Sequence, residues 1–521
     1  MTTVAVHDLR VGVGQDGSEI LHGVELELDA GQIVGVAGET GSGKTTLGLA
    51  LLGHLAPGLV ARAGVVDVAG ERTIDAERPP AAGRLRSLRG RVLSYVPQDP
   101  GGALNPGMTI GAAFAEVMRA HGEGDGRSRA ARCADLFRQV GLPAGDGFTR
   151  RYPHQLSGGQ QQRVAIAMAF ALDPAVVVMD EPTTGLDVAT KRRVSELIAR
   201  LARERGSTVV LISHDLPLLI ALADRIVVMH DGAIIEQGPA RAVADAPSHE
   251  YTRRLIAALP RPGDPPLSPA GDPLLSVEEL SARYGRSEVT HGLSLELRPG
   301  GCLAVVGESG SGKTTMARAI AGLHPDYDGR VLLDGGRLAR DAARRRREER
   351  RRLQYVFQNP WGALNPRRAV GPTIALAARR LLGVGRPEAR RRAATALAQV
   401  GLGPEFLDAL PHRLSGGQRQ RVAIARALVA EPEVMICDEV TSSLDLSVQA
   451  GVVELLQRLR TERGLALVFI THDLALAASI ADRVAVLKDG AVVESGDTRS
   501  VIGRPQSAYT AELVEMARAS W

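Results

Sequence analysis

The chain has 521 residues, of which 44% are hydrophobic and 23% are charged, and its formal net charge is +4. This length predicts more than one domain, and the ordinary globular composition excludes collagen, a coiled coil and wholesale disorder. The small net charge gives no reason to expect a nucleic-acid partner.

Cysteine content and the N-terminal sequence indicate the compartment. Cys133, Cys302 and Cys437 lie far apart and form no CxxC pair, so we expect neither a disulfide framework nor a zinc ribbon. The first residues lack the basic and apolar regions of a signal peptide. No run approaches the ~18 apolar residues of a membrane span. We therefore expect a reducing, cytoplasmic setting without a signal peptide or transmembrane segment.

The first motif is a glycine-rich turn between an apolar strand at 33–37 and a helix from Lys44, and it recurs after the strand at 303–306. Gly-x-x-x-x-Gly-Lys-Thr in this context is a P-loop, whose backbone N–H groups and lysine bind phosphates and whose threonine binds Mg²⁺. The chain has only four lysines, and two of them occupy these positions. The predicted nucleotide-binding residues are Gly38, Glu39, Thr40, Gly41, Ser42, Gly43, Lys44, Thr45 and Thr46, and Gly307, Glu308, Ser309, Gly310, Ser311, Gly312, Lys313, Thr314 and Thr315.

Leu-Ser-Gly-Gly-Gln occurs at 156–160 and again at 414–418, each time before a helical segment. A serine hydroxyl and the free N–H groups of a helix N-terminus form an anion site. Alone, this pattern indicates no more than a helix N-cap.

Asp180-Glu181 and Asp438-Glu439 end apolar strands that have the composition of strands buried on both faces. Each aspartate emerges at the carboxyl edge of the sheet beside a P-loop, where it can hold a metal ion through water. Each glutamate can accept a proton from, or orient, the water that attacks the γ-phosphate.

The remaining elements repeat as well. Apolar strands at 208–213 and 465–471 are each followed by a hairpin with an Asp-Gly turn. All motifs recur in the same order at a nearly constant spacing, which indicates a duplication. We predict an α/β fold with two tandem P-loop domains, each with a mostly parallel sheet core and an antiparallel part. The expected boundaries are 1–260 for the first domain, 261–273 for a proline-rich linker and 274–521 for the second domain.

In this order the motifs resemble those of the ATP-binding-cassette (ABC) ATPases over nearly the whole chain. The resemblance implies a helical subdomain in each domain. It also implies a Q-loop glutamine at Gln98 and Gln358, a D-loop aspartate at Asp187 and Asp445, and a switch histidine at His214 and His472. With Glu181 and Glu439, these glutamines and histidines are the expected catalytic residues, and the D-loop aspartates belong to the nucleotide site. The expected Mg²⁺ ligands are Thr45, Gln98 and Asp180, and Thr314, Gln358 and Asp438.

The family resemblance implies that the two domains pair head to tail. Each ATP would lie between the P-loop of one domain and the Leu-Ser-Gly-Gly-Gln segment of the other. Lys44 would share its nucleotide with Ser415, and Lys313 would share its nucleotide with Ser157. The segment residues that complete the sites would be Ser157, Gly158, Gly159 and Gln160, and Ser415, Gly416, Gly417 and Gln418.

ABC ATPases usually stack adenine on an aromatic residue near the start of each domain. Tyr284 fits this place in the second domain, but alignment puts Val13 there in the first. We expect weaker nucleotide binding at the first P-loop. Both domains keep every other catalytic group, so we expect two hydrolytic sites.

The segments after Gln98 and Gln358 share Q-x-P-x-x-x-L-N-P, which resembles the peptide/opine/nickel import ATPases. The tandem form, with a Tyr-Thr pair near each domain end, is similar to fused dipeptide- or glutathione-type import ATPases. This implies a peripheral protein on the cytoplasmic face of the membrane that uses ATP and Mg²⁺. Its partners would be two integral-membrane permease subunits and an extracytoplasmic solute-binding protein.

Two alternatives remain open. A tandem ABC ATPase acting on the ribosome usually has a long charged linker, whereas this join is short and proline-rich. A tandem sugar-import ATPase commonly has a degenerate second P-loop, whereas residues 307–314 are intact. Residues 240–275 contain no cysteine, so we expect no iron–sulfur cluster. The arginine-rich run at 344–352 is interpreted as a solvated helix face.

Overall fold

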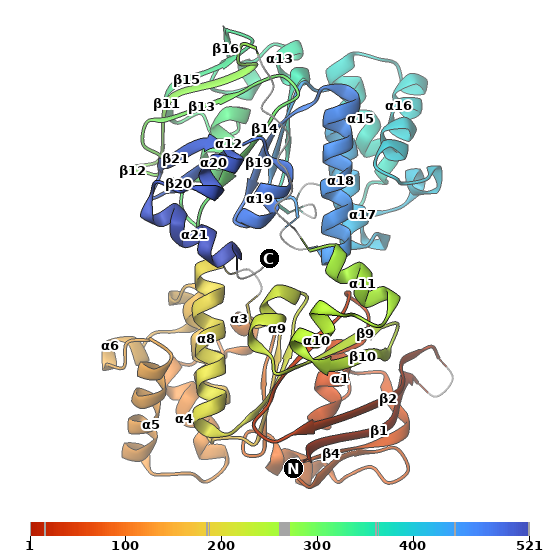
Figure 1. Cartoon of the computed structure of the whole chain (residues 1–521), viewed down its shortest axis with the longest axis vertical. Coiled ribbons are helices and arrows are strands. Elements are labelled where there is room, and N and C mark those ends of the chain that lie inside the picture. The colour runs from red at the N-terminus through yellow and green to blue at the C-terminus, as the bar shows by residue number, and fades with distance from the viewer. Residues whose placement is uncertain are drawn as a thin grey trace. The chain divides into compact units, whose positions relative to one another are not determined.

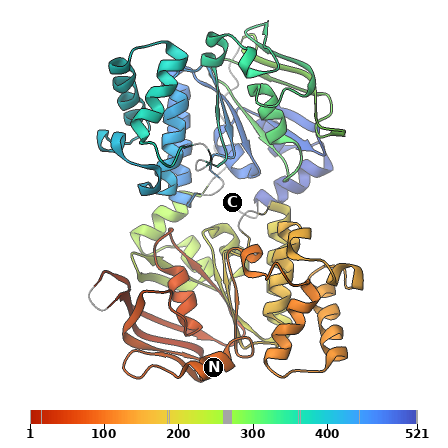
Figure 2. The same ribbon diagram turned by 180° about the vertical axis from the view of Figure 1, so that it is seen from behind.

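The computed structural model describes residues 2–14, 17–183, 186, 188–259, 271–359, 362, 364–441 and 444–518. The chain divides into two compact units, Met1–Leu186 with Thr190–Ala258, and Asp187–Ala189 with Leu259–Trp521. Figure 1 shows both units with many of their elements labelled, and Figure 2 shows them from behind. Most of the predicted linker, at 261–270, lies outside the described residues.

The first unit contains two sheets. One is antiparallel, in the order β2-β1-β4-β5. The other has the order β10-β9-β3-β8-β7-β6 and is parallel except for the β9–β10 hairpin. The strands are β1 (Thr2–Val13), β2 (Glu19–Asp29), β3 (Ile33–Ala37), β4 (Leu59–Val68), β5 (Glu71–Asp75), β6 (Leu93–Val96), β7 (Val176–Asp180), β8 (Thr208–Ile212), β9 (Arg225–His230) and β10 (Ala233–Pro239).

In the first unit, α3 to α7 form a helical part between β6 and β7 in the chain. The helices are α1 (Lys44–Leu51), α2 (Ala82–Leu88), α3 (Pro100–Ala103), α4 (Ile110–Ala120), α5 (Gly126–Gln139), α6 (Asp146–Thr149), the 3₁₀ turn η1 (Pro153–Gln155), α7 (Gly158–Ala169), α8 (Val188–Arg205), α9 (Leu216–Leu222), α10 (Ala240–Asp245) and α11 (Glu250–Ala257).

The second unit repeats this topology. Its parallel sheet has the order β17-β18-β19-β14-β20-β21, again with one antiparallel hairpin, β20–β21, at the edge. Its second sheet has the order β12-β11-β15-β16, with β13 also paired to β11. The strands are β11 (Leu275–Tyr284), β12 (Ser287–Glu288), β13 (Leu293–Leu297), β14 (Cys302–Val306), β15 (Tyr327–Leu333), β16 (Gly336–Arg337), β17 (Leu353–Val356), β18 (Val434–Asp438), β19 (Ala466–Thr471), β20 (Arg483–Lys488) and β21 (Ala491–Asp497).

Its helices are α12 (Lys313–Ala321), η2 (Ala342–Arg344), α13 (Arg347–Arg352), α15 (Val370–Leu382), α16 (Arg386–Gln399), η3 (Pro404–Asp408), η4 (Pro411–Arg413), α17 (Gly416–Leu428), α18 (Leu446–Arg463), α19 (Leu474–Ile480), α20 (Thr498–Gly503) and α21 (Ala508–Arg518). In Figure 1, α15, α16 and α17 lie on one side of β14 and β19, and the antiparallel strands lie on the other. The α/β fold with two tandem domains, each with an antiparallel and a helical part, is therefore confirmed.

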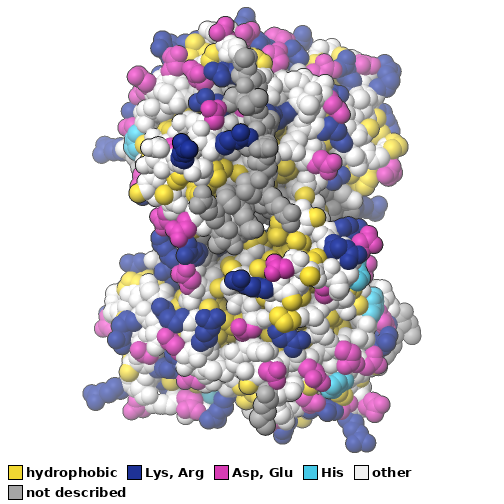
Figure 3. All heavy atoms as spheres, viewed as in Figure 1, with side chains coloured by type: hydrophobic (Ala, Val, Ile, Leu, Met, Phe, Trp, Pro, Cys, Tyr) yellow, Lys and Arg dark blue, Asp and Glu magenta, His cyan; other side chains and the backbone are white. Residues whose placement is uncertain are grey.

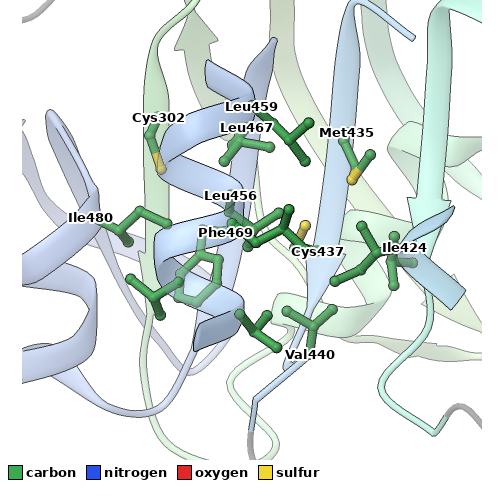
Figure 4. Close-up of a cluster of buried hydrophobic side chains, with 14 of the residues drawn as sticks. Cys302, Ile424, Met435, Cys437, Val440, Leu456, Leu459, Leu467, Phe469 and Ile480 are labelled. Carbon is green, nitrogen blue, oxygen red and sulfur yellow. The ribbon is translucent and has the colours of Figure 1, made fainter. Parts of the chain in front are cut away.

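The continuous apolar strands of the parallel sheets are buried along their whole length, as their composition predicted. Every residue of β3, β7, β8, β14, β18 and β19 is buried. Figure 4 shows how β18 and β19 pack Met435, Cys437 and Phe469 against Leu456 and Leu459 of α18. Because these strands are covered on both faces, the positions of the loops at their carboxyl ends are well defined.

The three cysteines are all buried. Burial raises the pKa of the Cys133 and Cys302 thiols to about 12 and raises the pKa of Cys437 as well. Figure 4 shows Cys302 and Cys437 among apolar side chains. These thiols are core residues that stay protonated at neutral pH.

The arginine-rich run at 344–352 is only partly a solvated face. Most of its side chains are exposed, and two of them, Arg346 and Arg351, form ion pairs with glutamates of α13. Arg345 is buried, and its guanidinium donates hydrogen bonds of 2.8 Å to the carbonyl oxygens of Ile320 and Ala339. The interpretation of the whole run as solvated is therefore wrong at Arg345, where backbone acceptors compensate for its burial.

The surface shows mixed charge. Figure 3 shows basic and acidic side chains interspersed over the face in view of each unit. Among the residues that the structure describes, no helix is long and apolar enough to cross a bilayer.

Candidate active sites

Each P-loop connects the carboxyl end of a buried strand to a helix. Gly38 has φ 147°, and a Cβ atom there would lie 2.3 Å from the Met229 carbonyl oxygen, so only glycine fits. Gly43 and Gly312 are the N-caps of α1 and α12, both with positive φ. Neither helix start has a side-chain cap, as expected of a helix N-terminus that binds an anion.

The P-loop lysines point back into their loops. The Lys44 ammonium donates to the carbonyl oxygens of Gly38 at 2.8 Å and Glu39 at 2.7 Å, and Lys44 is only 8% exposed. Lys313 makes the same pair of contacts, both at 2.7 Å. Each loop therefore holds a buried positive charge beside a helix N-terminus, which together suit the phosphates of a nucleotide.

The strand-end aspartates lie next to the P-loop helices. Asp438 accepts a hydrogen bond from the Thr314 hydroxyl at 3.2 Å and another from the Tyr355 hydroxyl at 2.5 Å. Asp180 accepts one from the Tyr95 hydroxyl at 3.2 Å. Burial raises the pKa of both carboxyl groups, although these hydroxyl donors oppose the shift.

A cation would favour the charged carboxylates and offset the cost of burying them. Threonine hydroxyl and carboxylate oxygens are ligands that Mg²⁺ prefers. The two sets of residues therefore fit Mg²⁺, with Thr45 and Asp180 in the first unit and Thr314 and Asp438 in the second.

The glutamates that follow have an unusual backbone. Glu181 has φ 51° and Glu439 has φ 46°. A positive φ at a non-glycine residue costs conformational energy, and such residues cluster at functional sites. The N–H of each donates to the neighbouring strand, from Glu181 to Ile212 at 2.9 Å and from Glu439 to Ile470 at 3.0 Å. This conformation fixes where each carboxylate leaves the sheet.

The glutamates contact the predicted switch histidines. In the first unit, His214 Nδ1 lies 2.7 Å from Glu181 Oε2, and the backbone N–H of His214 donates to Glu181 Oε1 at 3.0 Å. Burial disfavours charge on His214, but the hydrogen bond and charge of Glu181 outweigh it and raise the pKa of the imidazole. A histidine with a raised pKa can carry the proton that contact with a phosphate requires.

In the second unit, the predicted Q-loop glutamine also contacts the glutamate. The Gln358 amide donates to Glu439 Oε2 at 2.6 Å, and His472 Nδ1 lies 3.6 Å from Glu439 Oε1. Burial opposes charge on Glu439, but His472 and Lys313 outweigh it and lower its pKa. The carboxylate is therefore charged at neutral pH and can accept a proton from water. Gln98 has the corresponding place after β6 in the first unit.

The Leu-Ser-Gly-Gly-Gln segments begin helices, as predicted. Ser157 caps α7, where its hydroxyl accepts from the Gln160 N–H at 3.3 Å and its own N–H donates to the Gln160 side chain at 3.1 Å. Ser415 and Gln418 cap α17 in the same way. Both serines are exposed and can contact a ligand. Asp445 is the N-cap residue of α18, whereas Asp187 lies outside the described residues.

Sequence reasoning missed three side chains at these sites. Tyr95 and Tyr355 hold the buried aspartates, and each lies three residues before a Q-loop glutamine. That shared spacing is the signal that could have identified them. His324 lies beside Tyr284, with ring centroids 4.4 Å apart. The first unit has no histidine at the corresponding position, so the repeat gave no signal for this residue.

Val13 and Tyr284 end β1 and β11 and are 47% and 49% exposed. We expect Val13→Tyr to tighten nucleotide binding at the first P-loop, and Tyr284→Val to weaken it at the second, by about 1–3 kcal/mol, the scale of base–aromatic stacking. Titration with a fluorescent ATP analogue measures each site when the other is disabled by Lys44→Ala or Lys313→Ala. Equal affinities of the two unaltered sites would count against this account.

Comparison with known proteins identifies the family. The sequence profile described as "ABC transporter" matches residues 21–184 and 290–442, and the one described as "Oligopeptide/dipeptide transporter, C-terminal region" matches 235–282. The glutathione import ATP-binding protein GsiA of Salmonella typhimurium is 36% identical over 558 residues, covering 98% of this chain and 89% of the relative. The protein of the same name from Escherichia coli (strain K12) is 35% identical over 552 residues, with the same coverage.

A solved structure described as RNase-L Inhibitor aligns with a TM-score of 0.67 at 20% identity, covering 97% of this chain and 93% of that chain. This likeness concerns the fold alone. The two matches to the ABC profile and the full-length relatives agree with the motifs found in the sequence. The chain therefore belongs to the ABC transporter family of ATP-binding proteins and is an ATPase with two such domains in one polypeptide.

Proposed function

We propose that the chain is the energy-coupling ATPase of an ABC importer for glutathione, dipeptides or oligopeptides. The observation that carries the proposal is the similarity over 98% of the chain to proteins named for glutathione import. The match of residues 235–282 to a region of oligopeptide and dipeptide transporters supports the same substrate class. Nickel and opine-type solutes remain alternatives within this importer group.

Each unit would use its residues in the same way. Lys44 and Lys313, with the N–H groups at the starts of α1 and α12, bind the phosphates. Bound Mg²⁺ would neutralise charge on the phosphate oxygens. The residues that would hold it are Thr45, Gln98 and Asp180 in the first unit and Thr314, Gln358 and Asp438 in the second.

Glu181 and Glu439 would accept the proton of the attacking water. Their fixed backbone and their contacts with the histidines orient the carboxylates for this role. His214 and His472 would bind the γ-phosphate. Because each histidine contacts a glutamate, the position of that glutamate would depend on whether the γ-phosphate is present.

We further propose that the two units pair head to tail. Ser415, with the N-terminus of α17, would bind the nucleotide held by Lys44, and Ser157 would bind the one held by Lys313. The exposed serines and helix N-termini are suited to this, because each offers donors to an anion. Asp187 and Asp445 would lie at the same junctions. Joining the units raises their effective concentration to roughly millimolar, which favours pairing within one chain.

The expected partners are two membrane permease subunits, served by a solute-binding protein, with the chain on the cytoplasmic face. The second unit has a suitable docking groove of about 340 Å³ between α15, α16 and η3. Arg368, Arg379, Arg386 and Arg390 line it, together with Asp408, which lies 3.8 Å from Arg390, and apolar residues. A cytoplasmic permease segment with acidic and apolar side chains would complement it.

Purification of the chain with its membrane partners tests the assignment. The account predicts co-purification of two permeases and an ATPase rate in that complex that rises with glutathione or a short peptide. Stimulation by nickel or an opine alone would select the alternative solutes. Co-sedimentation with ribosomes in the absence of membrane partners would contradict the import function.

A further inference from the structure

The last helix of each unit contacts the P-loop of the same unit. The Tyr251 hydroxyl on α11 accepts a hydrogen bond from the backbone N–H of Glu39 at 3.1 Å. The Tyr509 hydroxyl on α21 accepts one from the N–H of Glu308, also at 3.1 Å. Both tyrosines are buried. The contact recurs although the residues around the two Tyr-Thr pairs differ, so it is a property of both units.

The tyrosine rings are held firmly in place. Tyr251 stacks on His230 with ring centroids 4.0 Å apart, and the Lys488 ammonium lies 4.6 Å from the centre of the Tyr509 ring. His230 and Lys488 end β9 and β20, immediately before the Asp-Gly turns of the hairpins. The ring positions are therefore tied to the edge of each parallel sheet.

The start of each last helix is anchored to the same hairpin. A glutamate on the second hairpin strand accepts two backbone N–H bonds from the residues before the tyrosine. In the first unit, Glu236 accepts from Ser248 at 2.7 Å and from His249 at 3.0 Å. Glu494 accepts the corresponding pair in the second unit, both at 2.9 Å. These bonds leave the tyrosine hydroxyl little freedom to move away from the P-loop.

The bonded N–H lies at the part of the loop that positions the lysine. Glu39 receives the tyrosine contact on its N–H, while its own carbonyl and that of Gly38 accept from the Lys44 ammonium. On the other side of the loop, the Gly232 N–H of the hairpin turn donates to the Ser42 carbonyl at 3.2 Å. The P-loop is thus fixed from two directions. A binding loop already held in its working conformation loses less entropy when the ligand binds.

We propose that Tyr251 and Tyr509 are positioning residues for the two P-loops. Each hydroxyl keeps the loop backbone in the conformation that binds phosphate. The inference depends only on ATP binding by the P-loops, so it stands or falls separately from the import function.

Tyr251→Phe and Tyr509→Phe in the full chain remove the hydroxyls and keep the rings. We expect each to weaken binding of a fluorescent ATP analogue about 3–10-fold at its own site, the loss expected for one hydrogen bond. Binding at the first site is measured with Lys313→Ala, and at the second with Lys44→Ala. KM for ATP should rise in proportion, while kcat stays within about twofold, because the hydroxyl contacts the loop rather than the reacting atoms.

Tyr327→Phe is the matched control. It removes a hydroxyl from an equally buried tyrosine on β15, outside both P-loop segments, and should change neither affinity. The proposal is overturned if Tyr251→Phe binds nucleotide as tightly as the unaltered chain. It is also overturned if Tyr251→Phe lowers affinity equally at both sites in step with a fall in Tm, since that pattern indicates general destabilisation.

Discussion

Replacing Glu181 and Glu439 together by glutamine should abolish ATP turnover while leaving ATP binding intact. Glutamine keeps the size of the side chain but cannot accept a proton from water. The loss of a general base costs about 10²–10⁴-fold in rate. The lowered pKa of Glu439 means that its carboxylate is ready to act at neutral pH. Phosphate release measures turnover, and the fluorescent analogue measures binding.

The single variants sharpen this test. If both sites hydrolyse, Glu181→Gln and Glu439→Gln alone should each leave activity at the other site, unless the two sites act in strict alternation. Asp473→Asn is a suitable control, because Asp473 caps α19 close to His472 but is not an expected base. A double variant that still turns over ATP at more than about a tenth of the unaltered rate would exclude the glutamates as the bases.

Replacing either P-loop lysine by arginine should weaken nucleotide binding at that site by about 10–100-fold, the scale of one or two hydrogen bonds to a charged group. The ammonium is buried and close to two carbonyl oxygens, and a planar guanidinium does not reproduce the compact geometry of an ammonium. Nearly all other basic residues of this chain are arginine, and only four are lysine. The exchange therefore tests whether these two positions need lysine in particular.

The reciprocal exchange at an exposed position provides the control. Arg344→Lys keeps the charge at the surface and should change binding at neither site. Isothermal titration with ATP analogues measures both variants. Lys44→Arg with unaltered affinity would show that the first loop tolerates a larger cation and that its lysine has no special role.

The fold was predictable, and candidate site residues could be named, because both depend on local patterns in the sequence. A glycine-rich turn between a buried strand and a helix leaves few alternatives to a P-loop, and an acid pair at a strand end is visible in the sequence. Because the sequence is duplicated, each motif occurs twice, and the second occurrence supports the interpretation of the first. The Asp-Gly turns also adopt the expected conformation, with positive φ at Asp231 and Gly232.

Other features depend on tertiary contacts that no local pattern carries. Arg345 differs from its neighbours only in the direction of its side chain, which is set by the carbonyl groups of Ile320 and Ala339. Tyr251 and Tyr509 marked a family in the sequence, but their contact with residues some 200 positions earlier appears only in the folded chain.

The head-to-tail arrangement is tested most directly by turnover at the first P-loop alone. In a Lys313→Ala background, Ser415→Glu would place a carboxylate against the triphosphate held by Lys44. The account predicts that hydrolysis falls at least about tenfold, whereas Ser157→Glu, which alters the same helix cap in the other unit, leaves it unchanged. If Ser415→Glu retains full turnover in a folded protein, or if Ser157→Glu is the variant that loses it, the two units do not complete each other's sites.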